Sequence, residues 1–323
     1  MNTDKKQIKI KNPIEQTKLY GYEEYFNSFN TLYRKNALPN SILLSGPKGI
    51  GKSTFVYHFI NFLLSINDDK SYSFKKFSIN EENRTYNLIK NSIHPNFYLL
   101  DNYESDQIKI EQVRNFLKFN NKSTYSRSVK FVLIDNAEKL NINSANALLK
   151  TIEEPSKDTF FFIIHNSNSK LLNTIKSRCV EFKINFSGNI KTKIFREIVK
   201  DYDLEFLDEE LESYIYFETP GGILRLFSTL KHYNIKFTDN TPQSIIDLME
   251  LYKKNNDNYL LKHISLLIEN FYKNLFIKNN DFNIDINRSR ISNLIHDAKK
   301  YNLDKKNLII SIDRILRNEY SLN

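Results

Sequence analysis

Gly46-Pro47-Lys48-Gly49-Ile50-Gly51-Lys52-Ser53 is the stretch that decides the fold of this chain of 323 residues. It fits the pattern G-x-x-x-x-G-K-[ST] at every fixed position, after the apolar run Ile42–Ser45 and before the helical spacing of Phe55–Leu64. In such a strand–loop–helix, backbone N–H groups wrap a phosphate, the helix start favours negative charge and the lysine reaches the outer phosphates. A chance glycine turn is the alternative. We predict that the loop and the first helical turn bind a nucleotide, through Gly46, Lys48, Gly49, Gly51, Lys52, Ser53 and Thr54.

A candidate magnesium ligand follows another apolar run. Phe131–Ile134 ends in Asp135, and a phosphate-loop NTPase needs an acid at such a strand end to hold Mg²⁺. The hydroxyl of Ser53 is suited to the same ion. A strand-end carboxylate in solvent is the alternative. We therefore predict that Ser53 and Asp135 hold Mg²⁺ together with the nucleotide.

The residue after this acid bears on catalysis. Many ATPases have a glutamate there, which positions the attacking water, but this chain has Asn136, with Glu138 two residues further on. An amide can hold water by hydrogen bonds but cannot take its proton. We expect Asn136 to occupy the water position and hydrolysis by this chain to be slow or absent.

The first half of the chain alternates between strand and helix patterns. Besides the two runs above, Phe97–Leu100, Phe160–Ile164 and Val180–Ile184 are predicted strands, and Glu111–Phe119 is helix-like. Continuous apolar strands separated by helices indicate a parallel sheet covered on both faces. We predict an α/β domain over residues 1–185.

The second half is predicted to be helical. Residues 186–240 show three short helical patterns, and residues 241–323 show longer ones after the Thr241-Pro242 break. We expect a small middle domain, a C-terminal helical domain and an Asn-rich loop at Lys278–Asn287. The predicted helices are Ile190–Val199, Leu204–Phe217, Gly222–Leu230, Ile245–Leu251, Leu260–Phe276, Ile291–Tyr301 and Leu308–Leu316.

Composition bounds the class of protein. The apolar share of 40% and charged share of 26% are typical of a globular chain. The single cysteine, Cys179, cannot form an internal disulfide or a multi-thiolate zinc site. No apolar run is long enough for a membrane helix, and Met1–Lys11 lacks the apolar core of a secretion signal, so we expect a cytoplasmic protein. The net charge of +9 favours a polyanionic partner such as nucleic acid, although AT-rich codon usage would also supply lysine.

Two further stretches carry a family resemblance. Asn146–Pro155 (NALLKTIEEP) and Ser177-Arg178-Cys179, preceded by Leu171–Lys176, resemble the NALLKTLEEP and LLPTIRSRC stretches of bacterial DNA polymerase III clamp-loader subunits. The resemblance runs from about Tyr20 to Ile184 and continues weakly through Pro220–Arg225. It implies a phosphate-loop AAA+ domain at 1–185, a three-helix lid at 186–240 and an all-α collar for oligomerisation at 241–323.

The resemblance also implies roles for single residues. Clamp-loader subunits bind ATP with Mg²⁺ and open a sliding clamp around primed DNA, and the arginine of the SRC motif acts in trans on ATP held by the neighbouring subunit. Arg178 is the matching residue, and a guanidinium offers a permanent charge and fixed donors to a γ-phosphate. Asn166 or Ser167, after the fourth strand, and Arg225, in the lid, match positions that sense the nucleotide. A surface or structural role is the alternative for each arginine.

Departures from the motor pattern favour one type of subunit. Motor subunits of the gamma/tau type carry a glutamate where this chain has Asn136, and many clamp-loader subunits carry a four-cysteine zinc module that residues 65–110 lack. His94-Pro95-Asn96 resembles the HPD of delta-prime sequences. The resemblance is thus to the delta-prime type, with the gamma/tau type as the alternative. Its ATPase is expected to be weak, within a DNA-directed DNA polymerase holoenzyme.

Partners follow from the same resemblance. We expect gamma/tau-type and delta-type subunits, the sliding clamp and primed DNA, the last through phosphate contacts. Two other classes stay open: a stand-alone nucleotide kinase, which would need paired Arg and Asp near the phosphate loop, and a collar protein that binds no nucleotide. Candidate DNA contacts are Lys109, Arg114, Lys122 and Arg127.

Overall fold

The computed structural model describes residues 10–101, 107–120, 129–156, 158–204, 214–215, 218–233, 241–255, 258–279, 283–301 and 303–320. The chain divides into two compact units. The sheet unit comprises Lys11–Glu197 with Thr219–Gly221, and the helical unit comprises Met1–Ile10, Ile198–Glu218 and Gly222–Asn323. The domain boundaries at residues 185 and 240 stay predictions.

The described strands of the sheet unit form one five-stranded parallel sheet in the order β2-β3-β4-β1-β5. All strands predicted from the apolar runs are present. Because the strands are parallel, their carboxyl ends share one edge, where ligands of such sheets bind. In the register of β1 and β4, Gly46 lies opposite Asn166 at this edge. The strands are β1 (Ser41–Gly46), β2 (Phe97–Leu100), β3 (Lys130–Ile134), β4 (Thr159–Asn166) and β5 (Val180–Lys183).

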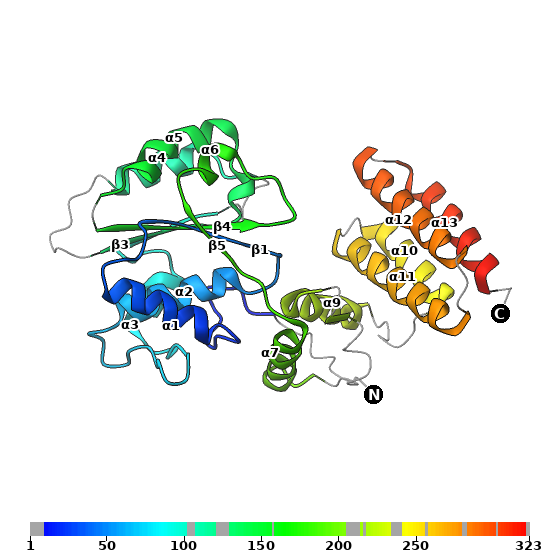
Figure 1. Cartoon of the computed structure of the whole chain (residues 1–323), viewed down its shortest axis with the longest axis horizontal. Helices are drawn as coiled ribbons and strands as arrows, with labels where there is room; N and C mark the ends of the chain where they lie inside the picture. Colours follow the sequence, from blue (N-terminus) through cyan, green and yellow to red (C-terminus); the bar gives the residue numbers. More distant parts are fainter. Residues whose placement is uncertain are drawn as a thin grey trace. The chain divides into compact units, whose positions relative to one another are not determined.

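Helices cover both faces of the sheet, as Figure 1 shows. Every residue of β1 and β3 is buried, which explains why these strands are almost continuously apolar. The predicted parallel sheet with two covered faces is therefore confirmed. One face carries α1 (Glu23–Arg34), α2 (Lys52–Leu64) and α3 (Arg84–Lys90), and the other carries α4 (Ile110–Asn120), α5 (Ile142–Glu153) and α6 (Asn173–Lys176).

Aromatic side chains join α1 to α2. Phe26 is fully buried, and its ring lies 5.4 Å from that of Phe59 and 6.2 Å from that of Phe55. Further rings around Phe26 come from the end of α2 and the loop beyond it: Phe62, Tyr72, Phe74 and Phe77. This cluster fixes α2, whose first turn follows the phosphate loop, against the rest of the unit.

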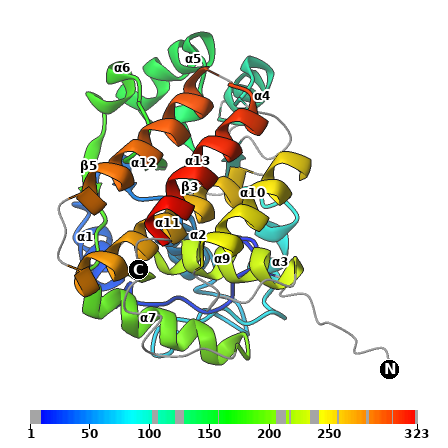
Figure 2. The ribbon, with the colours of Figure 1, turned by 90° about the vertical axis from the view of Figure 1, so that its right-hand side faces the viewer.

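The C-terminal part is helical, as predicted. In Figure 2, α10 and α12 each lie beside α11 and α13, and the contacts between elements agree. Their apolar residues face inward, for example Leu248, Ile264, Ile291 and Ile312. The helices are α10 (Pro242–Asn255), α11 (Asn258–Asn279), α12 (Asn283–Tyr301) and α13 (Lys305–Tyr320), preceded by α7 (Gly188–Asp201) and α9 (Pro220–His232).

The predicted bounds of one loop are wrong. The sequence predicts an irregular loop over Lys278–Asn287, but α11 continues to Asn279 and α12 begins at Asn283, and residues 280–282 between them lie outside the described part of the chain. Arg288 forms ion pairs with Asp285, in the first turn of α12, and with Glu269 of α11, which supports helix where the asparagines disfavour it. Most of the predicted helix Leu204–Phe217 lies outside the described residues. Among the residues that are described, no helix is long and apolar enough to cross a membrane.

Candidate nucleotide-binding site

Three consecutive carbonyl groups of the phosphate loop accept hydrogen bonds from the surrounding protein. The carbonyl of Lys48 accepts from Thr219 Oγ1 at 2.9 Å, and that of Gly49 accepts from the N–H of Gly221 at 3.1 Å. The hydroxyl of Tyr22 donates to the carbonyl of Ile50 at 3.2 Å. Because C=O and N–H point in opposite directions in a trans peptide, the N–H groups of the following residues face away from these donors. That orientation is the one a phosphate cradle requires.

Glycine is required at two positions of the loop. Gly49 has φ 85° and Gly51 has φ 101°, a left-handed region that residues with a Cβ rarely adopt. A Cβ at Gly51 would also lie 3.2 Å from the ring of Tyr22. Within the described part of the chain, the N–H groups of Gly49 and Gly51 donate to no protein acceptor. The loop thus presents donors that a ligand can use.

Lys52 lies at the start of α2 with its ammonium group turned back on the loop. Its Nζ donates to the carbonyl of Gly46 at 2.7 Å and to that of Pro47 at 2.8 Å. Burial lowers the pKa of Lys52 to about 8, and the negative charges of Asp135 and Glu138 oppose that shift. A phosphate would replace neutral carbonyls as the partner of this buried cation.

The two residues predicted to hold magnesium are in contact. Ser53 Oγ donates to the carboxylate of Asp135, with distances of 3.1 Å and 3.0 Å to its two oxygens. Asp135 is buried at the carboxyl end of β3, where its N–H donates to the carbonyl of Leu100. A hydroxyl and a carboxylate are hard oxygen ligands of the kind that Mg²⁺ prefers. The donor set therefore fits Mg²⁺ carried by a nucleotide.

A second carboxylate lies at the same edge of the sheet. Asn136 has φ 56° and begins the short 3₁₀ turn Ala137–Lys139, which carries Glu138 toward the end of β4. There Glu138 Oε2 accepts from the N–H of Asn166 at 3.2 Å. The sequence assigned no role to Glu138. Its position three residues after Asp135 was the sequence signal that could have indicated a role at this edge of the sheet.

Asn166 lies at the loop edge with its side chain engaged. Its amide donates to Ser169 Oγ at 3.2 Å and accepts from the N–H of Asn168 at 3.2 Å, which closes the turn after β4. The N–H of Ser167 donates to the carbonyl of Gly46 at 3.0 Å. The structure thus brings Asn166 and Ser167 to the phosphate loop, and a sensing role would require the Asn166 amide to change partner.

Arg178 is held by its own chain on another part of the sheet unit. Its Nε donates to Glu153 Oε2, at the end of α5, at 2.7 Å, and its Nη1 donates to the carbonyl of Thr174 at 3.0 Å. Its side chain is 29% exposed, so the guanidinium is accessible to a second molecule. Among the described residues, its partners belong to α5 and α6 and not to the phosphate loop. This geometry separates Arg178 from the nucleotide contacts of the same chain.

For the other predicted site residues, the structure gives the element on which each lies and the exposure of its side chain. The side chain of Lys48 is exposed, and Thr54 is half-buried in the first turn of α2. Arg225 is exposed on α9 and belongs to the helical unit. Lys109 and Arg114 are exposed at the start of α4, whereas the other two candidate DNA contacts, Lys122 and Arg127, lie outside the described residues.

Comparison with known proteins decides the family. Residues 21–187, more than half of the chain, match the family model described as DNA polymerase III, delta subunit. The chain belongs to the DNA polymerase III delta subunit family. The resemblance to clamp-loader subunits of the delta-prime type is thereby confirmed.

Individual relatives agree with this family. The chain is 36% identical over 143 residues to DNA polymerase III subunit delta' of Pseudomonas aeruginosa, a match covering 44% of this chain and 42% of that protein. It is 26% identical over 281 residues to subunit delta' of Buchnera aphidicola subsp. Baizongia pistaciae, covering 85% and 76%. A DNA polymerase III gamma subunit of Buchnera aphidicola subsp. Schizaphis graminum is 29% identical over 222 residues, covering 68% and 58%. The matches to the first delta' relatives thus span less than half of those proteins.

One solved structure of low sequence identity aligns with the chain. A DNA polymerase III gamma-subunit-related protein of Thermotoga maritima aligns with a TM-score of 0.47 and 18% identity, covering 90% of this chain and 99% of that one.

Proposed function

We propose that this chain is a delta-prime-type clamp-loader subunit that binds Mg-ATP and supplies Arg178 to ATP held by a neighbouring subunit. In this proposal the assembly places a sliding clamp on primed DNA. The observation that carries it is the separation of two sets of groups. At one place lies a phosphate loop whose Gly49 and Gly51 N–H groups have no acceptor among the described residues. At another lies the partly exposed Arg178, whose described partners are Glu153 and Thr174 and not the phosphate loop.

The residues of the phosphate loop have distinct tasks in this mechanism. The N–H groups of Gly49 and Gly51 bind phosphate oxygens, and Lys52 leaves its carbonyl partners to neutralise the outer phosphates. Ser53 and Asp135 would hold the magnesium ion, which would neutralise phosphate charge. Asn136 cannot take a proton from water, so retention of ATP is favoured over turnover.

In the proposed mechanism, Arg178 acts on the nucleotide of a neighbouring subunit. Glu153 and Thr174 hold two of its N–H donors and so fix the plane of the guanidinium. A guanidinium has five N–H donors, and in the part of the chain that the structure describes the others meet no acceptor that would compete with a phosphate. A rigid, permanently charged group stabilises the charge that develops on a transferring phosphoryl group. The reaction then takes place at the neighbour's nucleotide.

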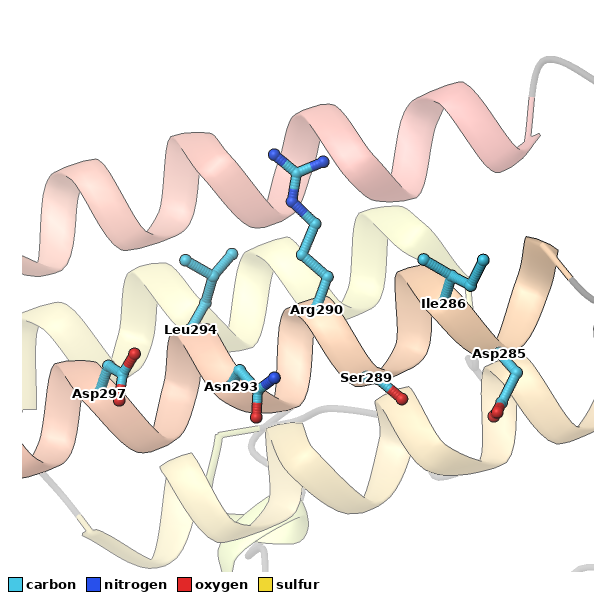
Figure 3. A pocket seen from close by; sticks show the side chains of 7 residues that line it. All are labelled: Asp285, Ile286, Ser289, Arg290, Asn293, Leu294 and Asp297. Carbon is cyan, nitrogen blue, oxygen red and sulfur yellow. The ribbon is translucent and has the colours of Figure 1, made fainter.

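The helical unit supplies the proposed oligomerisation surface. A groove of about 720 Å³ runs along α12. Figure 3 shows Ile286, Arg290 and Leu294 in one row of its lining and polar side chains in a second. Ile286 is 65% exposed. Two apolar side chains on either side of an arginine, beside a row of polar and acidic groups, are suited to a helix of a neighbouring subunit. The second row is formed by Asp285, Ser289, Asn293 and Asp297.

A motor of the gamma/tau type is the second candidate. The match to a gamma subunit over 68% of the chain supports it, and the lack of a glutamate at position 136, where this chain has Asn136, argues against it. Strong ATPase activity by the isolated chain would favour this alternative.

The experiment for the proposed function uses the assembled complex. We expect Arg178→Ala to leave assembly intact, as judged by size-exclusion chromatography, and to lower the DNA-stimulated ATPase about tenfold or more. Arg34→Ala removes an exposed arginine from α1 and serves as the matched control. Unchanged stimulated turnover with Arg178→Ala would refute the role in trans.

A further inference from the structure

We propose that Thr219-Pro220-Gly221, called the strap below, positions the phosphate loop for its ligand without touching that ligand. The strap is separated from the loop by about half of the chain, yet both belong to the sheet unit. Thr219 and Pro220 are buried, and Thr219 and Gly221 donate to the carbonyls of Lys48 and Gly49. The inference rests on the proposed binding of nucleotide by this loop.

The contact between strap and loop leaves no room for a side chain. A Cβ added at Gly221 would lie 2.6 Å from the carbonyl oxygen of Gly49 and 3.3 Å from its carbonyl carbon. Both atoms are backbone, so relief would require the loop or the strap to move. Glycine at position 221 therefore permits the hydrogen bond from its N–H to Gly49.

The strap restricts the backbone conformations of the phosphate loop, which its glycines would otherwise leave unusually flexible. Gly46, Gly49 and Gly51 give the loop more accessible backbone conformations than other residues would, and ordering such a segment on binding costs conformational entropy. Hydrogen bonds to consecutive carbonyls hold the peptide planes of this segment before a ligand arrives. Pre-ordering of this kind raises affinity because the competent conformation is populated in the free protein.

The strap and the ligand also act on the same peptide groups. The carbonyl of Lys48 shares its peptide plane with the N–H of Gly49, so a phosphate that accepts from this N–H makes the carbonyl a better acceptor for Thr219. Because coupling between two binding events is reciprocal, nucleotide should tighten the strap as the strap tightens nucleotide.

The test is a titration of the full chain with a fluorescent ATP analogue and Mg²⁺. We expect Thr219→Val, which removes the hydroxyl with little change of shape, to weaken binding about fivefold, the scale of one hydrogen bond. Thr219→Ser keeps the hydroxyl and should restore affinity. Gly221→Ala should weaken binding about tenfold or more, since it displaces backbone from backbone.

Matched controls carry the same chemical changes elsewhere. Thr241→Val removes a hydroxyl that accepts from Ser244 at the start of α10, and Gly188→Ala adds a Cβ that meets nothing within 4 Å. Both should bind the analogue within about twofold of the unaltered chain. Melting temperatures are measured for all variants, and if Gly221→Ala does not fold, the threonine variants decide.

Hydrogen exchange gives a readout that a purely structural strap would not change. In the unaltered chain, Mg-ATP should slow exchange of the Gly221 amide, and this slowing should be smaller in Thr219→Val. Equal affinities of Thr219→Val, Thr219→Ser and the unaltered chain for the ATP analogue would overturn the proposed positioning role of the strap while leaving the proposed function intact. Failure of the unaltered chain to bind any analogue would overturn both.

Discussion

The charge of Lys52 should make nucleotide binding depend on pH. Burial lowers the pKa of this lysine to about 8, so its ammonium loses its proton above that pH in the free protein. A bound phosphate favours the charged form and raises the pKa again. We expect the affinity for Mg-ATP to be constant near pH 7 and to fall about tenfold per pH unit above pH 8.

Isothermal titration between pH 7 and pH 9.5 measures this dependence. Lys52→Arg should bind more weakly but without the inflection, because a guanidinium keeps its proton throughout this range. A flat profile for the unaltered chain would contradict the proposed contact between Lys52 and phosphate.

The ion pair of Arg178 with Glu153 predicts a positioning effect. Both side chains are partly exposed, so Glu153→Gln should change the free energy of unfolding by less than about 1 kcal/mol. In the assembled complex the same change should lower the DNA-stimulated kcat about threefold and leave KM for ATP unchanged, because one of two anchors of the guanidinium is weakened.

Glu154→Gln is the control for this prediction, since it removes the adjacent exposed carboxylate without breaking that pair. Equal effects of the two variants would indicate a general loss of negative charge at the end of α5.

At the scale of single residues, one contact of the site could be predicted from the sequence and others could not. The approach of Ser53 to Asp135 could be anticipated, because a strand end and the start of a neighbouring helix meet at one edge of a parallel sheet. The contacts of Glu138 with Asn166 and of Glu153 with Arg178 could not, because they join residues 28 and 25 positions apart through side-chain geometry.

Among the helices and strands, the docking of α1 on α2 depends on Phe26. This ring is fully buried among the aromatic side chains of α2 and the following loop. Phe26→Ala should lower the free energy of unfolding of the sheet unit by about 3–5 kcal/mol, through lost burial and a residual cavity. Urea unfolding followed by circular dichroism measures the change.

Ser28→Ala, on the exposed side of α1, should stay within about 0.5 kcal/mol of the unaltered chain. A loss for Phe26→Ala as small as that would mean that the aromatic cluster does not hold α1 in place.

The strands were predictable because their two buried faces demand continuous apolar runs, as in Phe131–Ile134. The start of α12 was not. Its first five residues, Asn283-Ile284-Asp285-Ile286-Asn287, are asparagine, aspartate and β-branched residues of modest helix propensity. The ion pair of Arg288 with Glu269 that supports this start depends on α11 lying alongside, and a second ion pair joins Arg288 to Asp285. Tertiary contact therefore overrides local propensity at this point.

For the whole molecule, each unit contains a buried histidine that should make it sensitive to acid. Burial lowers the pKa of His58, in the sheet unit, and of His263, in the helical unit, to about 3. The unfolded chain binds these protons below pH ~6.5, whereas the native chain binds them only near pH 3. Stability is therefore lost as pH falls through this interval, by about 2 kcal/mol for each histidine at pH 5.

His263→Leu tests this prediction in one unit. In the described part of the chain neither ring nitrogen of His263 has a hydrogen-bond partner, so an apolar side chain of similar size should be tolerated. Calorimetry at pH 7 and pH 5 should show that the variant loses less stability in acid than the unaltered chain. Equal losses would mean that other groups cause the acid sensitivity.

The proposal as a whole depends on a working nucleotide site in a subunit whose arginine serves its neighbour. Calorimetric titration of the full chain with ATP, with and without Mg²⁺, examines that site in isolation. We predict saturable binding at a single site, loss of binding in Lys52→Ala, and loss of the magnesium dependence in Asp135→Asn. Absence of binding by the unaltered chain, or binding that Lys52→Ala leaves unchanged, would contradict it.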